Sequence, residues 1–191
     1  MASAEPIRDQ SQALSFLAYF LERGQYRNYA MVTIGIYTAL RIGDILKLRW
    51  NDVYDFDTKR MKNFIFLTEQ KTGKRKQIAL HKNVIDALTL YFSNASPNTP
   101  IIKNEQTSLA ISRIQAYRII DGAAKSVGIP HKVSCHSLRK TFGYHSRHNG
   151  TSLALLTEIF NHNSYTTTKR YLGITQDEKN NAYLNFNIWQ N

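Results

Sequence analysis

The sequence of 191 residues contains one cysteine, Cys135, so the chain cannot form an internal disulfide bond. No apolar run approaches the roughly 20 residues of a membrane-spanning helix. The first residues, MASAEPIRDQSQ, lack the basic-then-apolar pattern of a secretory signal. There is no internal repeat and no low-complexity segment. These absences argue against a disulfide-stapled or membrane-embedded fold, and they favour the cytoplasm as the compartment.

Acidic residues are scarce, with 14 Asp and Glu against 25 Lys and Arg, which gives a net charge of +11. The cations are spread along the chain and do not form one terminal block. Because 42% of the residues are apolar, the chain has the composition of a folded domain with a real core. The excess charge therefore predicts a folded surface that faces DNA or RNA phosphates. An anionic membrane surface is the weaker alternative, and added solubility is the simplest one.

Hydrophobic periodicity predicts a mainly α domain with one small antiparallel β-sheet, an α+β fold. Two apolar runs, residues 63–68 and 76–80, flank Gly73 and predict a β-hairpin. In the first predicted helix, Leu14, Leu17 and Leu21 lie on one face. The predicted helices cover residues 11–23, 29–40, 43–50, 83–92, 109–127, 134–148, 152–160 and 165–172.

The stretch SCHSLRKTFGYHSRH places His136 and Arg139 three residues apart, on the same face of a helix. A guanidinium cannot neutralise by losing its proton, so this pair fits poorly into an apolar core. An anion facing both side chains is one interpretation, and a surface pair without a role is the other.

Two further interpretations concern the same stretch. His145 and His148 have the spacing of two metal ligands on a helix, but no carboxylate or thiolate is placed to join them. Cys135 precedes His136, as in a thiol–imidazole pair. Adjacent residues on a helix point in different directions, however, so a buried structural cysteine is the preferred interpretation.

In YTALRIGDILKLRW, Arg41 directly follows an apolar helix. A cation at that position needs a partner, which is either the nearby Asp44 or the phosphate of a ligand. The tip of the predicted hairpin is basic, which is common for a solvated loop and also suits insertion into a DNA groove. Its cations are Lys71, Lys74, Arg75 and Lys76.

A fourth stretch, FNHNSYTTTKRYLGI, places Tyr171 nine residues after His162 and directly after Lys169 and Arg170. Taken alone, it describes one half-buried tyrosine among eleven, with charged neighbours that face water.

Together, these stretches resemble the tyrosine recombinases, also called the phage integrase family. The resemblance covers residues 10 to 175 and includes four motifs in the family's order: TALRIGDILKLRW, EQKTGKRKQIAL, HSLRKTFGYH and FNHNSYTTTKRYLGI. The gap of 23 residues from Arg139 to His162 and the gap of nine from His162 to Tyr171 are common in the family. The resemblance implies six catalytic residues: Arg41, Lys71, His136, Arg139, His162 and the nucleophile Tyr171.

The resemblance implies a site-specific recombinase that works through a 3′-phosphotyrosyl intermediate without metal, ATP or another cofactor. Arg41 and Arg139 are expected to bind the non-bridging phosphate oxygens. Lys71 is the expected acid for the departing 5′-oxygen, although Lys74 and Lys76 lie close by. His136 is the expected base or acid for the tyrosine hydroxyl, and His162 is expected to hydrogen-bond the phosphate.

The sequence departs from the family's pattern at three points. Asn161 stands where Gly often precedes the second histidine, and asparagine tolerates a left-handed backbone better than most residues. Ala39 stands where Gly is common before the Leu-Arg pair. The N-terminal core-binding domain that many members carry is expected to be absent, and the chain is either an excised catalytic fragment or a compact member like the recombinases that invert fimbrial promoters.

The expected organisation is a catalytic domain over residues 1–175 and a C-terminal tail over residues 176–191. The tail is expected to dock on a neighbouring protomer, and the alternative is that its apolar residues cap the core of this domain. Apolar residues of the tail are Leu184, Phe186, Ile188 and Trp189. The expected DNA-contacting residues are Lys74, Arg75, Lys76, Lys140, Lys169 and Arg170.

The expected partner is double-stranded DNA with inverted-repeat core sites, and a membrane is not expected. The chain is expected to be a monomer in solution and a tetramer on paired sites, encoded by a bacterium or a phage. A topoisomerase-like enzyme and a catalytically inactive DNA-binding module are the alternatives.

Overall fold

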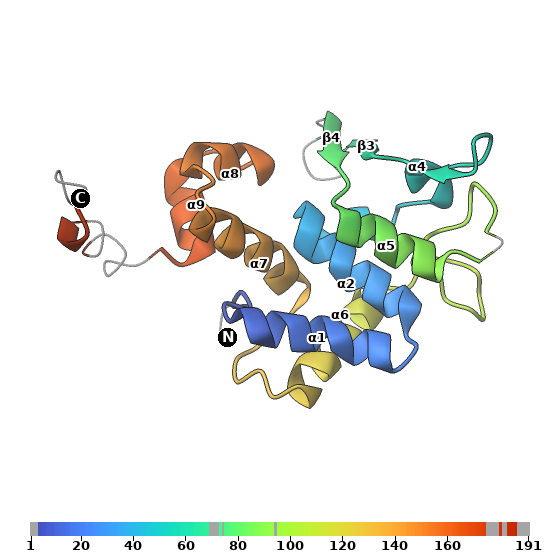
Figure 1. Ribbon diagram of the computed structural model, residues 1–191, viewed down its shortest axis with the longest axis horizontal. Coiled ribbons are helices and arrows are strands. Elements are labelled where there is room, and N and C mark those ends of the chain that lie inside the picture. Colours follow the sequence, from blue (N-terminus) through green and yellow to red (C-terminus); the bar gives the residue numbers. More distant parts are fainter. Residues whose placement is uncertain are drawn as a thin grey trace, which may run out of the picture. The chain divides into compact units, whose positions relative to one another are not determined.

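The structure, a computed structural model, describes residues 4–68, 73, 75–93, 95–174, 180 and 183–186. The chain forms two compact units, residues 1–145 and 146–191, and Figure 1 shows their elements. The first unit contains α1 (Gln10–Glu22), α2 (Tyr26–Thr38), α3 (Ile42–Ile45), α4 (Trp50–Val53), β1 (Tyr54–Asp55), β2 (Arg60–Met61), β3 (Phe64–Thr68), β4 (Arg75–Ala79), α5 (Lys82–Tyr91) and α6 (Arg113–Ser126). The second contains α8 (Leu153–Ile159) and α9 (Tyr165–Leu172), and α7 (Cys135–His148) begins in the first unit and ends in the second.

The core of the first unit is built around α2, which is buried almost all round, as the sequence predicts. Helix α5 lies alongside α2 (Figure 1), and α1 also packs against it. Fully buried side chains of this core include Phe16, Met31, Ile34, Leu88 and Ile120. Across the described residues, no helix is long and apolar enough to span a membrane.

The start of α7 packs closely against α2 at Gly35. A Cβ atom built on Gly35 would lie 2.7 Å from Cδ1 of Leu138, which is too close for any larger residue without movement. Leu138 is buried and directly precedes Arg139. The glycine therefore sets the depth at which this part of α7 meets the core.

In helix α1, Leu17 packs against the core as predicted, but the most deeply buried residues belong to a different face. Leu14 is 58% exposed and Leu21 is 41% exposed, whereas Phe16 and Phe20 are buried. The two phenylalanine rings contact each other edge to face, with centroids 5.5 Å apart. Because a phenylalanine ring buries more apolar surface than a leucine side chain, the aromatic face packs inward.

The predicted hairpin is confirmed: β3 and β4 pair in antiparallel register, with Phe66 opposite Gln77 and Thr68 opposite Arg75. Gly73 lies in the connection with a φ of +67°, a conformation that glycine adopts without strain. The prediction of a single sheet was wrong, because β1 and β2 form a second two-stranded sheet. These strands have only two residues each, too few to produce a period-two pattern.

Two predicted helix boundaries also differ. The helix expected over residues 43–50 is divided, since α3 ends at Ile45 and α4 begins at Trp50. The helix expected from residue 109 begins instead at Arg113, because Ser112 and Gln115 form a capping box. In that motif, each side chain accepts a hydrogen bond from the other residue's backbone N–H.

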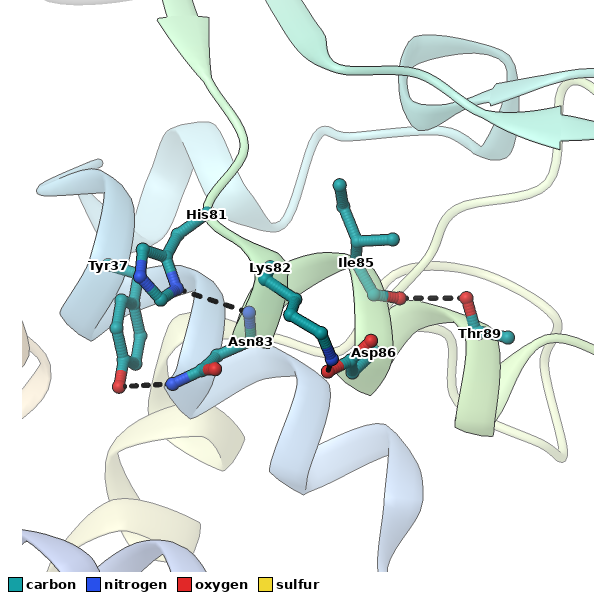
Figure 2. A network of polar contacts seen from close by, with 7 residues as sticks. All are labelled: Tyr37, His81, Lys82, Asn83, Ile85, Asp86 and Thr89. Carbon is teal, nitrogen blue, oxygen red and sulfur yellow. Dashed lines mark hydrogen bonds and ion pairs between the residues drawn. The ribbon is translucent and has the colours of Figure 1, made fainter.

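A small polar network joins the end of the hairpin to the end of α2 (Figure 2). His81 follows β4 and caps α5 by accepting the backbone N–H of Asn83 at Nδ1, at 3.1 Å. Its ring stacks on Tyr37 of α2, with centroids 4.8 Å apart, and the amide of Asn83 donates to the Tyr37 hydroxyl at 2.6 Å. The base of the β3–β4 hairpin is thereby tied to the helix that directly precedes Arg41.

Candidate active site

A pocket of about 390 Å³ in the first unit brings together three of the predicted catalytic residues. Arg41 comes from the turn between α2 and α3, while His136 and Arg139 come from the first turns of α7. The residues that line the pocket are Arg41, Ile42, Gly43, Asp44, Arg113, Cys135, His136 and Arg139. The prediction that His136 and Arg139 share a face is confirmed.

The turn that carries Arg41 depends on a left-handed residue. Ala39 ends α2 with a φ of 55° and a ψ of 19°. An alanine in this region carries a penalty of about 1–2 kcal/mol, because its Cβ lies close to the following carbonyl oxygen. The turn then brings Arg41 into an extended conformation at the start of α3, where its side chain lines the pocket.

Arg139 is 4% exposed and its Nη1 donates a hydrogen bond to the carbonyl oxygen of Ala39. A buried guanidinium stays charged, so it must find hydrogen-bond acceptors in the protein or in a ligand. The carbonyl of Ala39 is one such acceptor. This contact joins α7 to the turn that positions Arg41, across 100 residues of sequence.

The pocket carries an excess of positive charge. Arg41, Arg113 and Arg139 line it together with a single carboxylate, that of Asp44. Three guanidiniums and one carboxylate leave two positive charges in excess, without counting His136. Asp44 is 7% exposed. The negative charge of its carboxylate reduces the repulsion among the three guanidiniums. The charge balance favours an anionic ligand.

Arg113 is a pocket residue that the sequence did not reveal. A Cβ atom built on Gly43 would lie 2.6 Å from Nη2 of Arg113, so the absence of a side chain at Gly43 makes room for this guanidinium. The contact joins the first residue of α6 to α3. The stretch SRIQ, residues 112–115, has the pattern of a capping box, which would have placed Arg113 at the start of a helix. No local pattern indicated which surface Arg113 faces.

His136 and Cys135 differ in their exposure at the mouth of this pocket. His136 is exposed, so its imidazole has access to solvent and to a ligand. Cys135 is half-buried, and burial raises the pKa of its thiol to about 11. The thiol is therefore protonated at neutral pH, which agrees with the interpretation of Cys135 as a structural residue and not a nucleophile.

His145, for which metal binding was one interpretation, makes a contact inside the first unit. Its Nε2 lies 3.0 Å from the carbonyl oxygen of Ile7. Since a carbonyl only accepts, Nε2 is the donor in this hydrogen bond. The backbone N–H of Ile7 in turn donates to the Thr141 hydroxyl, so two side chains of α7 hold the N-terminal segment.

The hairpin cations are only partly described. Lys71 and Lys74 lie outside the described residues, so the predicted catalytic lysine remains a prediction. Arg75 is exposed on β4, whereas Lys76 is half-buried and points to the opposite face of the strand.

Lys140, predicted to contact DNA, is partly buried on α7. Burial lowers the pKa of its ammonium group, and the nearby Glu5 carboxylate acts in the opposite direction. Its partial burial distinguishes Lys140 from the exposed Lys169 and Arg170.

In the second unit, the turn between α8 and α9 carries His162. Asn161 adopts a φ of 49°, as expected for a residue that replaces glycine in a left-handed position. Ser164 then caps α9 by accepting the backbone N–H of Thr167 at 3.2 Å. The left-handed residue and the cap fix where His162 leaves the backbone.

A pair of threonine hydroxyl groups orients the His162 ring through a contact at its Nδ1 atom. Nδ1 of His162 lies 3.0 Å from the hydroxyl of Thr168, and the Thr157 hydroxyl lies 2.9 Å from that of Thr168. Thr168 is fully buried, so this group of contacts is shielded from water. The contact at Nδ1 therefore fixes the orientation of the His162 ring.

Tyr171 lies on the last turn of α9 and is half-buried. Its ring contacts His162 edge to face, with centroids 5.1 Å apart, and contacts Phe160 at 5.2 Å. Lys169 and Arg170 are exposed beside it. Cations at the C-terminal end of a helix also stabilise its dipole, which gives both residues a structural reason to be there.

The described part of the tail leaves large apolar side chains in water. Tyr183 is 81% exposed, Leu184 is 80% exposed and Phe186 is 73% exposed. Ile188 and Trp189, also predicted to be part of this apolar segment, lie outside the described residues. The described tail residues therefore do not contribute to a core of their own.

Comparison with known proteins agrees with the geometry. Residues 8–178 match the phage integrase family. The chain is 36% identical over 186 residues to the probable integrase/recombinase YoeC of Bacillus subtilis, covering 97% of this chain and 98% of YoeC. Its fold is similar to that of XerA recombinase, with a TM-score of 0.76 and 21% identity over 97% of this chain and 67% of that one.

A further similar structure is the XerH site-specific recombinase bound to its difH substrate. The TM-score is 0.71 with 17% identity, covering 100% of this chain and 56% of that one. The chain also matches curated XerD recombinases, such as that of Listeria innocua, and spans about half of their length.

The raised pKa of Cys135 predicts slow modification of its thiol. Because burial raises the pKa to about 11 from 9.0, the thiolate fraction at pH 8 is about 100-fold smaller than for an unperturbed thiol. A colorimetric disulfide reagent should react at least that much more slowly with the native chain than with the urea-unfolded chain. The native rate should still rise about tenfold per pH unit at pH 9, where the unfolded thiol levels off. Equal rates in both states would contradict the burial argument.

Proposed function

The chain belongs to the phage integrase family of site-specific tyrosine recombinases, and on that basis we propose that it cleaves and rejoins DNA through a 3′-phosphotyrosyl intermediate. The observation that supports this most is the convergence of Arg41, His136 and Arg139 on one positively charged pocket. A scissile phosphate is an anion that suits such a pocket.

The two arginines of the motifs are proposed to bind the non-bridging oxygens of the scissile phosphate. Negative charge on these oxygens grows as the nucleophile approaches phosphorus. Guanidiniums remain charged at any working pH and donate in a planar fork that matches two oxygens. Arg139 already makes a hydrogen bond to Ala39, which holds its side chain in place before DNA binds. Such preorganisation reduces the reorganisation needed at the transition state.

Tyr171 is the proposed nucleophile. Its phenolic oxygen attacks phosphorus, and the bond from phosphorus to the 5′-oxygen breaks. The 5′-oxygen leaves as a hydroxyl after accepting a proton, for which Lys71 is the proposed donor. Phosphotyrosine conserves the energy of the phosphodiester bond, so a 5′-hydroxyl can attack it and reseal the strand without ATP.

The two histidines have different proposed roles. His136, which is exposed and lines the pocket, is the proposed base that takes the tyrosine proton and returns it during resealing, a role that an imidazole can fill. His162 is the proposed hydrogen-bond donor to the phosphate. The contact between its Nδ1 and Thr168 supports this role, because it holds the imidazole ring in one orientation.

Double-stranded DNA is the proposed substrate, and inverted-repeat core sites are its proposed organisation. The Tn1549 transposon integrase, which is similar in fold, has been solved in complex with transposon right end DNA. The net charge of +11 supports binding through phosphates. Exposed Arg75, Lys169 and Arg170 are stronger candidates for this contact than Lys76 and Lys140, which are partly buried. Lys74 is a candidate from the sequence alone. Since the relatives are bacterial recombinases of DNA, the proposed compartment is the bacterial cytoplasm.

The proposed assembly is a monomer in solution and a tetramer on two paired sites. Residues 1–175 form the proposed catalytic domain, and the tail is proposed to dock on a neighbouring protomer. The exposure of Leu184 and Phe186 supports this arrangement, because their burial needs another surface. With Ile188 and Trp189, the four side chains would contribute on the order of 6–12 kcal/mol before the entropy of association is subtracted.

Replacing the nucleophile tests the function directly. Tyr171→Phe should abolish the covalent protein–DNA adduct, because the attacking oxygen is lost, while DNA affinity stays within about twofold of the parent. A suicide substrate, which traps the adduct after cleavage, and a denaturing gel provide the measurement. Tyr165→Phe, at an exposed position of the same helix, is the matched control and should retain adduct formation. An adduct that persists in the Tyr171 variant would assign the nucleophile to another residue.

A bridging sulfur distinguishes Lys71 from its neighbours. A thiolate leaves without a proton, so a substrate with sulfur at the 5′-bridging position should restore cleavage if Lys71 is the acid. Lys71→Ala should cleave ordinary DNA more slowly by at least about 100-fold and the sulfur-substituted DNA near the parental rate. Lys74→Ala should cleave both substrates alike. If the sulfur rescues Lys74→Ala and not Lys71→Ala, the acid is Lys74.

Removal of the tail tests the assembly. A chain lacking residues 180–191 should bind a single site with parental affinity and lose synapsis of two sites, measured by gel shift and by recombination of two labelled duplexes. Its thermal unfolding should remain within a few degrees of the parent, because the described tail residues are exposed. Normal recombination by the shortened chain would show that the tail is dispensable.

A further inference from the structure

The β3–β4 hairpin has two faces of opposite character. Side chains of Ile65, Leu67 and Ile78 point inward and are buried or half-buried. The outward face is exposed along its whole length, and it begins with two aromatic rings on alternate residues. Its members are Phe64, Phe66, Thr68, Arg75, Gln77 and Ala79, which we call the outer hairpin face.

The phenylalanines of the outer hairpin face are unusual surface residues. Phe66 is 68% exposed and Phe64 is 41% exposed, whereas Ile65, between them on the inner face of the strand, is fully buried. Gln77 lies opposite Phe66, and Arg75 lies opposite Thr68 in the pairing register. A hollow of about 430 Å³ runs along the same strands, lined by Phe66, Leu67, Thr68, Arg75, Lys76 and Gln77. The face thus combines rings with hydrogen-bonding and cationic groups.

The charge around the outer hairpin face selects the kind of partner. Residues 59–82 contain eight Lys or Arg and one Glu. A second copy of this chain, with a net charge of +11, would be repelled by such a segment unless acidic groups were concentrated at the contact. A polyanion is attracted by it. Cations beside aromatic rings form the type of surface on which nucleic acid bases stack.

The spacing of the two positions along the strand suits a single base. Alternate residues of a strand are separated by about 7 Å, at about 3.4 Å per residue. A stacked base occupies about 3.4 Å along a strand, so one base fits between rings at that separation. A paired base inside a duplex is already stacked on both sides. Only an unpaired base presents both of its faces to such rings.

We propose that the outer hairpin face binds unpaired bases of DNA, with Phe64 and Phe66 as the stacking residues and Arg75 as the contact to the adjoining phosphate. The inference rests on the proposed function, because strand exchange separates bases from their partners after cleavage. The same hairpin carries the proposed acid, Lys71, in its connection. The hairpin that protonates the departing 5′-oxygen would therefore also bind the unpaired bases of the strand that carries it.

The experiment measures the coupling between a base and a ring. The full chain carrying Tyr171→Phe, which blocks cleavage, is titrated against a labelled duplex with a short unpaired segment and against the same DNA with abasic residues in that segment. Loss of the bases should weaken binding by about 5- to 150-fold, the range for stacking of one base on an aromatic side chain. Phe66→Leu should weaken binding of the base-containing DNA by a similar factor and leave binding of the abasic DNA unchanged.

Three comparisons keep the result interpretable. Phe66→Trp keeps a ring and should retain the preference for bases, whereas Leu14→Ala, a change at another exposed apolar residue, should leave both affinities unchanged. Equal losses on the two DNAs for Phe66→Leu would overturn the proposal, as would a preference for bases that survives this change. Adduct formation by the parent chain on a suicide substrate is measured separately. If the adduct forms without base coupling, the proposed function stands and the stacking surface does not. If base coupling is found but no adduct forms, the stacking surface stands and the proposed function does not.

Discussion

The hydrogen bond from the buried Arg139 guanidinium to the carbonyl of Ala39 is the constraint on which the pocket depends. Arg139 cannot lose its charge, so it remains buried only where acceptors are provided. The carbonyl is presented by a left-handed turn, which an alanine adopts only against a conformational penalty. The same turn brings Arg41 to the pocket. One contact therefore fixes two cations that are separated by 98 residues of sequence but line one pocket.

The second unit positions His162 by a different principle. Its ring is held by neutral hydroxyls, with Thr168 buried behind Nδ1 and Thr157 behind Thr168. Neutral partners fix the orientation of an imidazole without adding a charge that would oppose an incoming phosphate. In each unit the proposed catalytic side chains are thus oriented by contacts inside that unit. Such preorganisation would reduce the reorganisation needed during the proposed reaction.

The sequence predicted those parts of the molecule that local pattern determines. Helical periodicity located α2 and α7, and Gly73 between two apolar runs located the hairpin. The motif spacing selected Arg41, His136 and Arg139, which the pocket then brought together. The inward face of α1 and the position of Arg113 were not predicted, because competition between Phe16 and Leu14 for the core and the fit of Arg113 against Gly43 are tertiary effects. No window of sequence contains both a face of α1 and the core that it packs against, or both Gly43 and Arg113.

The outer hairpin face and the pocket would contribute to DNA binding in physically distinct ways. Contacts between cations and phosphates are independent of DNA sequence. They weaken steeply at higher salt, because the release of counterions from DNA is then less favourable. Stacking of a base on Phe66 buries apolar surface and involves little net charge, so it is far less sensitive to salt. Phosphate contacts are available on any duplex, whereas stacking needs a base that has left its partner. A hairpin with both kinds of group therefore responds to the state of the DNA, because the aromatic contribution is added only once the strands have separated.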